Sequence, residues 1–224
     1  MKILLRNAHI LDPVSGRDET SDVLVVDGRI EKFGKSISEK ADREINLNGK
    51  LVVPGLMDMH VHLREPGFEH KETIETGCRA AAYGGFTGVA CMPNTNPAID
   101  DESVARYVQE KARHAFKGIV DVYPIAAATK GRQGAELSPM AELVEAGAVG
   151  FSDDGSPIMN ANIMRRAFEY SSMYGVPVIQ HAEDATMTHG GSMNEGFQST
   201  RLGLPGIPSV AEELMIGRDI LLLR

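Results

Sequence analysis

The sequence predicts an α/β protein built on a parallel sheet that is buried on both faces. From residue 51 onward, apolar segments of strand length alternate with longer segments of helical periodicity. The strand segments are nearly continuous apolar runs, which is typical of parallel strands with both faces covered. Five strands and five helices can be counted in this part of the chain, so we expect a series of five βα units.

The first strand of the series is expected over residues 51–62 and ends in polar side chains. The other strands are expected at 87–92, 121–128, 148–151 and 177–181. The helices are expected at 71–83, 101–116, 139–146, 160–174 and 210–223. Gly84 and Gly85 are interpreted as the stop of the first helix, and the glycine-rich run 187–206 as a loop over a barrel mouth or as disorder.

Residues 1–50 are predicted to form a small β module. Turn residues separate its strand-like segments, and Asp27 followed by Gly28 is a strong hairpin signal. The strands are expected at 2–10, 21–26, 29–33 and 44–47. Since no long helical pattern could cover this sheet, we expect the module to pack against another part of the protein.

The pattern of the last helix and the number of βα units indicate whether the predicted fold is complete. The last helix has no glycine stop and no capping signal, and five βα units cannot close an eight-stranded barrel. We therefore expect a fragment of a longer protein. The alternative is a complete open sheet with a frayed last helix.

Charge and composition exclude several classes of function. With 23 basic and 31 acidic residues the net charge is −8, which argues against a nucleic-acid surface. No apolar run is long enough to span a membrane, and the N-terminus lacks the pattern of a signal peptide. Cys78 and Cys91 are the only cysteines and form no CxxC motif, so a reduced cytoplasmic setting is expected.

Asp58, His60 and His62 alternate at the end of the first strand, so their side chains share one face. Two imidazoles at the carboxyl end of a parallel strand can bind one metal ion, and zinc favours nitrogen ligands with carboxylate support. The HxH pattern alone is weak. Its alternative is a pair of partly exposed strand histidines without a ligand.

Two further strand ends are polar. Asp153 and Asp154 follow the fourth strand, where the alternative is an ordinary Asp-Gly turn. His181 ends the fifth strand, where the alternative is a histidine satisfied in the core. Because catalytic groups of βα barrels lie at the carboxyl ends of strands, three polar ends favour one site. His60, His62, Asp154 and His181 are therefore a candidate zinc cage.

Four segments carry a resemblance to a known family. Residues 53–62 resemble the first-strand signature of the amidohydrolase superfamily, and residues 63–67 narrow the resemblance to dihydroorotases, hydantoinases and allantoinases. Residues 91–97 and 151–156 are similar to segments of bacterial type I dihydroorotases. The resemblance covers essentially the whole chain.

The resemblance implies a β-sandwich module beside a (β/α)8 TIM-type barrel with one or two zinc ions at its mouth. Residues 1–50 would be the N-terminal part of the module and residues 51–224 the N-terminal portion of the barrel, which is incomplete here. The family's sixth-strand histidine and its eighth-strand aspartate, the general base, have no counterpart in the sequence. Little or no activity is therefore expected from the chain alone.

The resemblance also implies roles for individual residues. His60, His62, Asp154 and His181 match the metal ligands, and Asp154 is the metal-site carboxylate assigned a catalytic role. Asp153 stays the alternative carboxylate, since only the spacing to His181 favours Asp154 over it.

Arg64 and Asn94, together with His62, match positions that hold the substrate carboxylate. An arginine suits this role because its guanidinium pairs bidentately with a carboxylate.

The implied reaction is the reversible cyclisation of N-carbamoyl-L-aspartate to L-dihydroorotate in pyrimidine biosynthesis. A hydantoinase or allantoinase is the alternative enzyme, although these would carry a lysine at the position of Asp154. The alternative of another class is a non-catalytic partner of aspartate transcarbamoylase. The expected partners are the small-molecule substrate, further copies of the chain and, by resemblance, aspartate transcarbamoylase.

Overall fold

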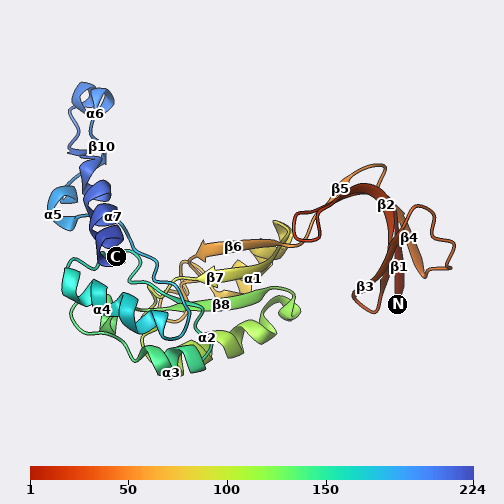
Figure 1. Cartoon of the computed structure of the whole chain (residues 1–224), viewed down its shortest axis with the longest axis horizontal. Helices are drawn as coiled ribbons and strands as arrows, with labels where there is room; N and C mark the ends of the chain where they lie inside the picture. Colours follow the sequence, from red (N-terminus) through yellow and green to blue (C-terminus); the bar gives the residue numbers. More distant parts are fainter. The chain divides into compact units, whose positions relative to one another are not determined.

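The computed structural model describes residues 1–224 and divides them into two compact units, Met1–Gly55 and Leu56–Arg224 (Figure 1). The first unit is a five-stranded mixed sheet. Its strands are β1 (Lys2–Asp12), β2 (Arg17–Val26), β3 (Arg29–Gly34), β4 (Arg43–Asn46) and β5 (Leu51–Val52). The sheet order is β3-β2-β1-β4, and β5 also pairs with β1. The four expected strands are confirmed, with longer bounds for β1 and β2.

The turn between β2 and β3 shows why the sequence folds there as a hairpin. Asp27 and Gly28 both have positive φ, at 49° and 80°. A two-residue turn of this kind needs positive φ at both positions, which aspartate tolerates and glycine adopts freely. β2 then pairs antiparallel with both β1 and β3.

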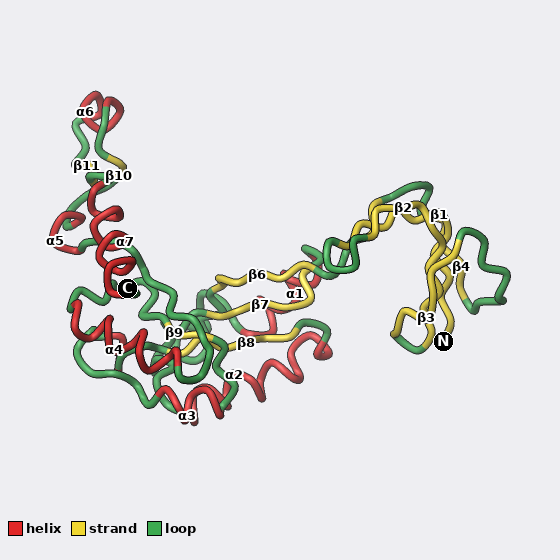
Figure 2. Tube along the Cα trace, in the orientation of Figure 1, coloured by secondary structure: helices red, strands yellow, loops and turns green.

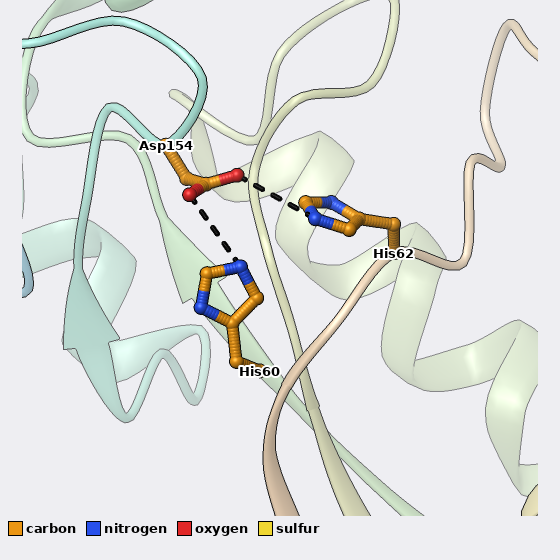
Figure 3. A group of neighbouring side chains, drawn as sticks. All are labelled: His60, His62 and Asp154. Atoms are coloured by element: carbon orange, nitrogen blue, oxygen red, sulfur yellow. Dashed lines mark ion pairs between the residues drawn. The ribbon is translucent and has the colours of Figure 1, made fainter. Parts of the chain in front are cut away.

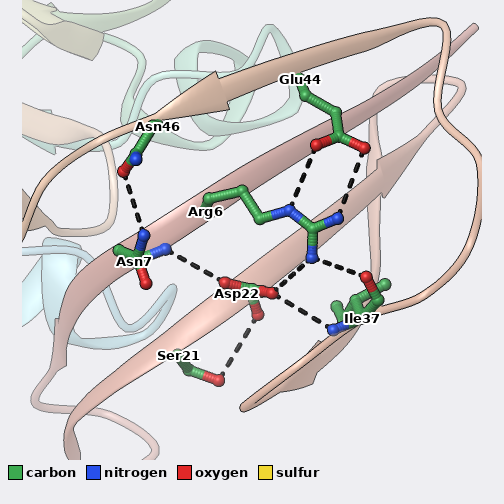
Figure 4. A network of polar contacts seen from close by, with 7 residues as sticks. All are labelled: Arg6, Asn7, Ser21, Asp22, Ile37, Glu44 and Asn46. Atoms are coloured by element: carbon green, nitrogen blue, oxygen red, sulfur yellow. Dashed lines mark hydrogen bonds and ion pairs between the residues drawn. The ribbon is translucent and has the colours of Figure 1, made fainter.

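A buried carboxylate ties the strands of the first unit together (Figure 4). Asp22 on β2 is 4% exposed and accepts from the Asn7 backbone N–H at 3.0 Å, the Arg6 guanidinium at 2.8 Å and the Ile37 N–H at 3.2 Å. Arg6 on β1 also pairs with Glu44 on the neighbouring strand β4. Burial alone would raise the pKa of Asp22, but these donors outweigh it, and the pKa lies below its ordinary value.

The second unit holds a four-stranded parallel sheet in the order β6-β7-β8-β9. Its strands are β6 (Leu56–Val61), β7 (Phe86–Cys91), β8 (Asp121–Ala126) and β9 (Gly150–Phe151). The long helices are α1 (Ile74–Tyr83), α2 (Glu102–His114), α4 (Ala161–Ser172) and α7 (Val210–Leu222). Figure 2 shows β6, β7 and β8 running side by side, with α2 and α3 along one side of them. The α/β class and the parallel sheet are confirmed.

Shorter elements complete the second unit. They are the helices α3 (Met140–Glu145), α5 (Ala185–Thr188) and α6 (Phe197–Leu202), the strands β10 (Met193–Asn194) and β11 (Gly206–Ile207), and two 3-10 turns, η1 (Ala115–Gly118) and η2 (Lys130–Arg132). The run 187–206 is thus neither a plain loop nor disordered, because β10 and β11 pair within it. None of the helices combines the length and the apolar character needed to cross a membrane.

Side-chain alternation builds two apolar layers on the parallel sheet. Val89 and Cys91 of β7 join the large cluster beneath the helices, which also contains the fully buried Phe151. Ala90, between them in sequence, faces the other way and packs with Ile125 in a smaller inner cluster. Burial raises the pKa of the Cys91 thiol to about 12, and its side chain packs in the large cluster.

Two expectations about the strands are wrong. The strand expected over 51–62 is split, because Pro54 has no N–H to donate and β5 pairs with β1 of the first unit. β6 is moreover an edge strand, paired only with β7, and Met59 on it is 74% exposed. The strand expected at 177–181 is reduced to one bridge between Phe151 and Val178.

The Asp22 network yields a prediction about stability. Asp22→Asn should lower the unfolding free energy of the first unit by about 2 kcal/mol at pH 7, since hydrogen bonds to a charged group are lost. The pKa of Asp22 is depressed by folding, so its stabilisation is complete above the unfolded value of about 3.9 and is lost as the pH falls through the lower folded value. Native-state hydrogen exchange of the β1 and β2 amides measures both effects.

Asp18→Asn is the matched control, because this aspartate on the same strand is 70% exposed. It should change stability by less than about 0.5 kcal/mol. Equal effects of the two substitutions at pH 7 would contradict the role given to Asp22.

Candidate metal centre

The polar strand ends of the second unit meet at one edge of the parallel sheet. His60 lies in β6 and His62 directly follows it, while Asp154 lies three residues past β9. Because parallel strands present their carboxyl ends at the same edge, residues about ninety positions apart come together there. Figure 3 shows both imidazoles directed at the Asp154 carboxylate. His60, His62 and Asp154 are called the cluster below.

The distances within the cluster are those expected between ligands of one ion. Nε2 of His60 is 3.4 Å from Oδ1 of Asp154, and Nε2 of His62 is 3.7 Å from Oδ2. Ligand atoms at tetrahedral zinc, each about 2.0–2.2 Å from the ion, lie about 3.3–3.6 Å apart, which is longer than a hydrogen bond. All three residues offer ligand atoms within 4.8 Å of one another. Two imidazoles and a carboxylate therefore fit a zinc ion.

His181 approaches the same carboxylate from outside the cluster. Its Nδ1 is 3.6 Å from Oδ1 of Asp154, and its Nε2 is 3.3 Å from the Glu183 carboxylate. The segment that carries it is held to β9 by backbone hydrogen bonds from Phe151 to Pro177 and from Ile179 to Phe151. The structure thus brings the four candidate ligands of the sequence together, with the three histidines around Asp154 and His181 less tightly grouped.

Asn94 bridges two members of the cluster. Its side-chain amide nitrogen donates to Oδ2 of Asp154 at 3.3 Å, and its oxygen is 2.9 Å from Nδ1 of His62. An ionised carboxylate only accepts, so the amide nitrogen must face Asp154 and the oxygen must face His62. His62 then donates from Nδ1, which leaves the lone pair of Nε2 directed at the cluster. This is the usual way in which a neighbouring group fixes a metal-binding tautomer.

The two adjacent aspartates have different surroundings. Asp154 faces the histidines, whereas Asp153 is 2% exposed and accepts hydrogen bonds from the backbone N–H and the hydroxyl of Thr129. Burial raises the pKa of Asp153, although the Thr129 bonds act in the opposite direction. The geometry accordingly favours Asp154 over Asp153 as the carboxylate of the cluster.

Arg64 lies on the segment between β6 and α1, with a positive φ of 62°. The next residue, Glu65, is 6% exposed and anchors that segment. Its carboxylate accepts from the Ile74 N–H at 2.9 Å and from the Tyr107 hydroxyl at 2.9 Å. Arg64 takes no part in the hydrogen bonds of the cluster, so its role as a substrate ligand stays a prediction.

Sequence reasoning missed three supporting residues: Glu65, which anchors the segment of Arg64, and Thr129 and Arg132, which contact Asp153 and Asp154. Arg132 donates from Nη1 to the Asp154 carbonyl oxygen at 2.7 Å, a tertiary contact that the local sequence does not predict. Glu65 lies within a recognised motif but next to the arginine that drew attention. Thr129 gives no signal in the sequence, because a threonine after a strand is ordinary.

Comparison with known proteins places these residues in a family context. The sequence matches the family described as Dihydro-orotase-like over residues 49–224. It is 54% identical over 222 residues to a dihydroorotase of Pelotomaculum thermopropionicum, covering 99% of this chain and 51% of that protein. It is 51% identical over 220 residues to a dihydroorotase of Acetivibrio thermocellus, covering 98% of this chain and 51% of that protein. The chain thus spans about half the length of these relatives.

Solved structures show the same fold at low identity. An L-hydantoinase from Arthrobacter aurescens superposes with a TM-score of 0.78 at 22% identity, covering 98% of this chain and 50% of that one. A crystal structure of a dihydroorotase superposes with a TM-score of 0.58 at 13% identity, covering 99% and 62%. At these identities the likeness concerns the fold alone.

The Asn94 bridge predicts a loss of metal affinity on truncation. Asn94→Ala should weaken zinc binding by about 10–100-fold, because His62 loses the acceptor that fixes its tautomer. Competition with a chromophoric chelator measures this. Asn162→Ala on the exposed surface of α4 is the control and should bind zinc like the unsubstituted protein. Equal affinities for the two variants would rule out the bridge.

Proposed function

The chain belongs to the dihydro-orotase-like family, and on that premise we propose that it carries part of the active site of a dihydroorotase. The proposed reaction is the reversible cyclisation of N-carbamoyl-L-aspartate to L-dihydroorotate, a step of pyrimidine biosynthesis. The observation that carries the proposal is the convergence of His60, His62 and Asp154 at the carboxyl edge of a parallel sheet. The relatives that are 54% and 51% identical to the chain are named dihydroorotases.

The proposed cofactor is zinc, as one or two ions, held by His60, His62, Asp154 and His181. A bound zinc ion supplies a Lewis acid and lowers the pKa of water to about 7. The protein's part is to hold two imidazoles and a carboxylate in place before the ion arrives. Asn94 contributes by directing the lone pair of His62 to the cluster.

The proposed substrate ligands are His62, Arg64 and Asn94. Both L-dihydroorotate and N-carbamoyl-L-aspartate carry a carboxylate, which a guanidinium fork can pair with at two points. Glu65 supports this role, because its buried contacts fix the segment that presents Arg64. A substrate held at its carboxylate keeps the amide at a defined distance from the cluster, so that ring opening by water becomes effectively unimolecular.

The proposal extends to architecture and setting. The parallel unit is proposed to be part of a (β/α)8 barrel, with Leu56–Arg224 as its N-terminal portion and Met1–Gly55 as part of a β-sandwich module. Cys78 and Cys91 are unpaired and buried, which supports a reducing cytoplasmic compartment. Self-association and an association with aspartate transcarbamoylase are proposed from the family resemblance, and size-exclusion chromatography with and without that enzyme tests them.

The proposal predicts that activity depends strongly on His60. In the protein as its gene encodes it, His60→Ala should lower zinc content and slow the opening of L-dihydroorotate by at least about 100-fold, since a ligand is lost. Activity is measured in preparations whose zinc is quantified by elemental analysis. His114→Ala is the matched control, because this histidine on α2 is 81% exposed and outside the cluster. Unchanged activity of the His60 variant would refute the assignment.

The substrate is tested on the same protein. L-dihydroorotate, hydantoin and allantoin should be assayed side by side, and L-dihydroorotate should be opened fastest. Asp154 stands where a hydantoinase would carry a lysine, which is the reason for this expectation. A preference for hydantoin or allantoin would replace the proposed substrate but keep the metal site.

A further inference from the structure

We propose that Thr129 and Asp153 form a clamp that directs the neighbouring Asp154 carboxylate at the histidines of the cluster. The two residues act as positioning residues from outside the set of ligands. The inference rests on the proposed metal-binding role of Asp154. It assigns distinct functions to two adjacent aspartates that look equivalent in the sequence.

The contacts of the clamp are buried, and the Thr129 hydroxyl both donates and accepts a hydrogen bond. The carboxylate of Asp153 accepts from the Thr129 backbone N–H at 3.0 Å through Oδ1 and from the Thr129 hydroxyl through Oδ2. The same hydroxyl accepts from the Gly134 N–H at 2.8 Å. Thr129 is 0% exposed and Asp153 is 2% exposed, so water cannot replace either bond. The hydroxyl therefore has one fixed orientation.

The backbone of Asp154 is held on both sides of its Cα atom. Its N–H donates to the Ser152 hydroxyl at 3.0 Å, and its carbonyl oxygen accepts from Arg132 at 2.7 Å. Arg132 belongs to the same segment after β8 as Thr129, so this one segment grips the turn after β9 at two successive residues. With Asp153 drawn toward Thr129, the side chain of Asp154 is left on the histidine side.

The Asp154 carboxylate itself accepts one hydrogen bond, from Asn94 at 3.3 Å, and the clamp adds a second constraint on its direction. A ligand that could rotate freely would have to be ordered when the ion binds, which weakens binding. Loss of groups that orient a ligand typically costs 10–100-fold in metal affinity. The clamp thus predicts a defect in metal affinity from residues that do not themselves touch the ion.

The first test removes only the hydroxyl of the clamp. Thr129→Val keeps the shape and the backbone donor, and it should weaken Co²⁺ binding by about 10–100-fold and alter the visible absorption of the bound Co²⁺. Thr129→Ser restores a hydroxyl and should return the affinity to within about threefold, as expected for a hydrogen bond of this kind. Full affinity in the valine variant, or no rescue by serine, would overturn the proposal.

The second test separates the clamp from direct coordination. Asp153→Asn can still accept from the Thr129 N–H and can donate to its hydroxyl, so Co²⁺ affinity should fall by less than about 10-fold. Asp154→Asn removes the proposed ligand, so the affinity for Co²⁺ should fall by more than about 100-fold. An Asp153→Asn variant that loses Co²⁺ as fully as Asp154→Asn would identify Asp153 as a ligand and refute the clamp.

A general loss of stability is controlled by Ser171→Ala on α4. This hydroxyl is also buried, with the residue 3% exposed, and bonds only to the Phe168 carbonyl oxygen. It should reduce thermal stability but leave Co²⁺ affinity unchanged. An affinity defect in Ser171→Ala equal to that of Thr129→Val would overturn the positioning role.

All variants are made in the protein as its gene encodes it, and the readout is binding of Co²⁺ without substrate. Normal binding with no turnover of L-dihydroorotate would remove the proposed reaction while the clamp stands. Turnover with a normal Thr129→Val affinity would remove the clamp while the reaction stands. The two failures are therefore distinguishable.

Discussion

The carboxylate of Asp154 is the point on which the geometry of the candidate site depends. Its two oxygens face different imidazoles, with His60 and His181 on Oδ1 and His62 on Oδ2. These groups come from β6, the end of β9 and the segment bridged to β9, which only a parallel sheet brings to one edge. The site therefore depends on the βα order of the chain, because that order places the polar strand ends at the same edge.

Local sequence predicted much of the fold, because most elements carry their own signals. Asp27 and Gly28 mark a hairpin, and apolar runs between helical segments mark parallel strands. The errors occur where a partner decides the outcome. The position of β6 at the sheet edge depends on which strands pair with it, and Pro177 and its neighbours form one bridge only. Periodicity within a segment carries no information about such pairing.

The ligands of the candidate site could be predicted from the sequence, but the residues that orient them could not. Alternation in the strand placed His60 and His62 on one face, and the common edge of a parallel sheet brought Asp154 to them. The choice between Asp153 and Asp154 could not be made from local pattern, because either can follow a strand. It depends on Thr129, which lies 24 residues before Asp153 and donates to it twice. Supporting residues of this kind are ordinary in sequence and acquire a role only through tertiary contact.

The edge position of β6 has a consequence for the behaviour of the chain at high concentration. An unpaired strand edge offers a row of backbone donors and acceptors to any other chain, and β6 adds exposed methionines to that row. The same strand carries His60, so a chain that paired along this edge would lie next to the candidate site.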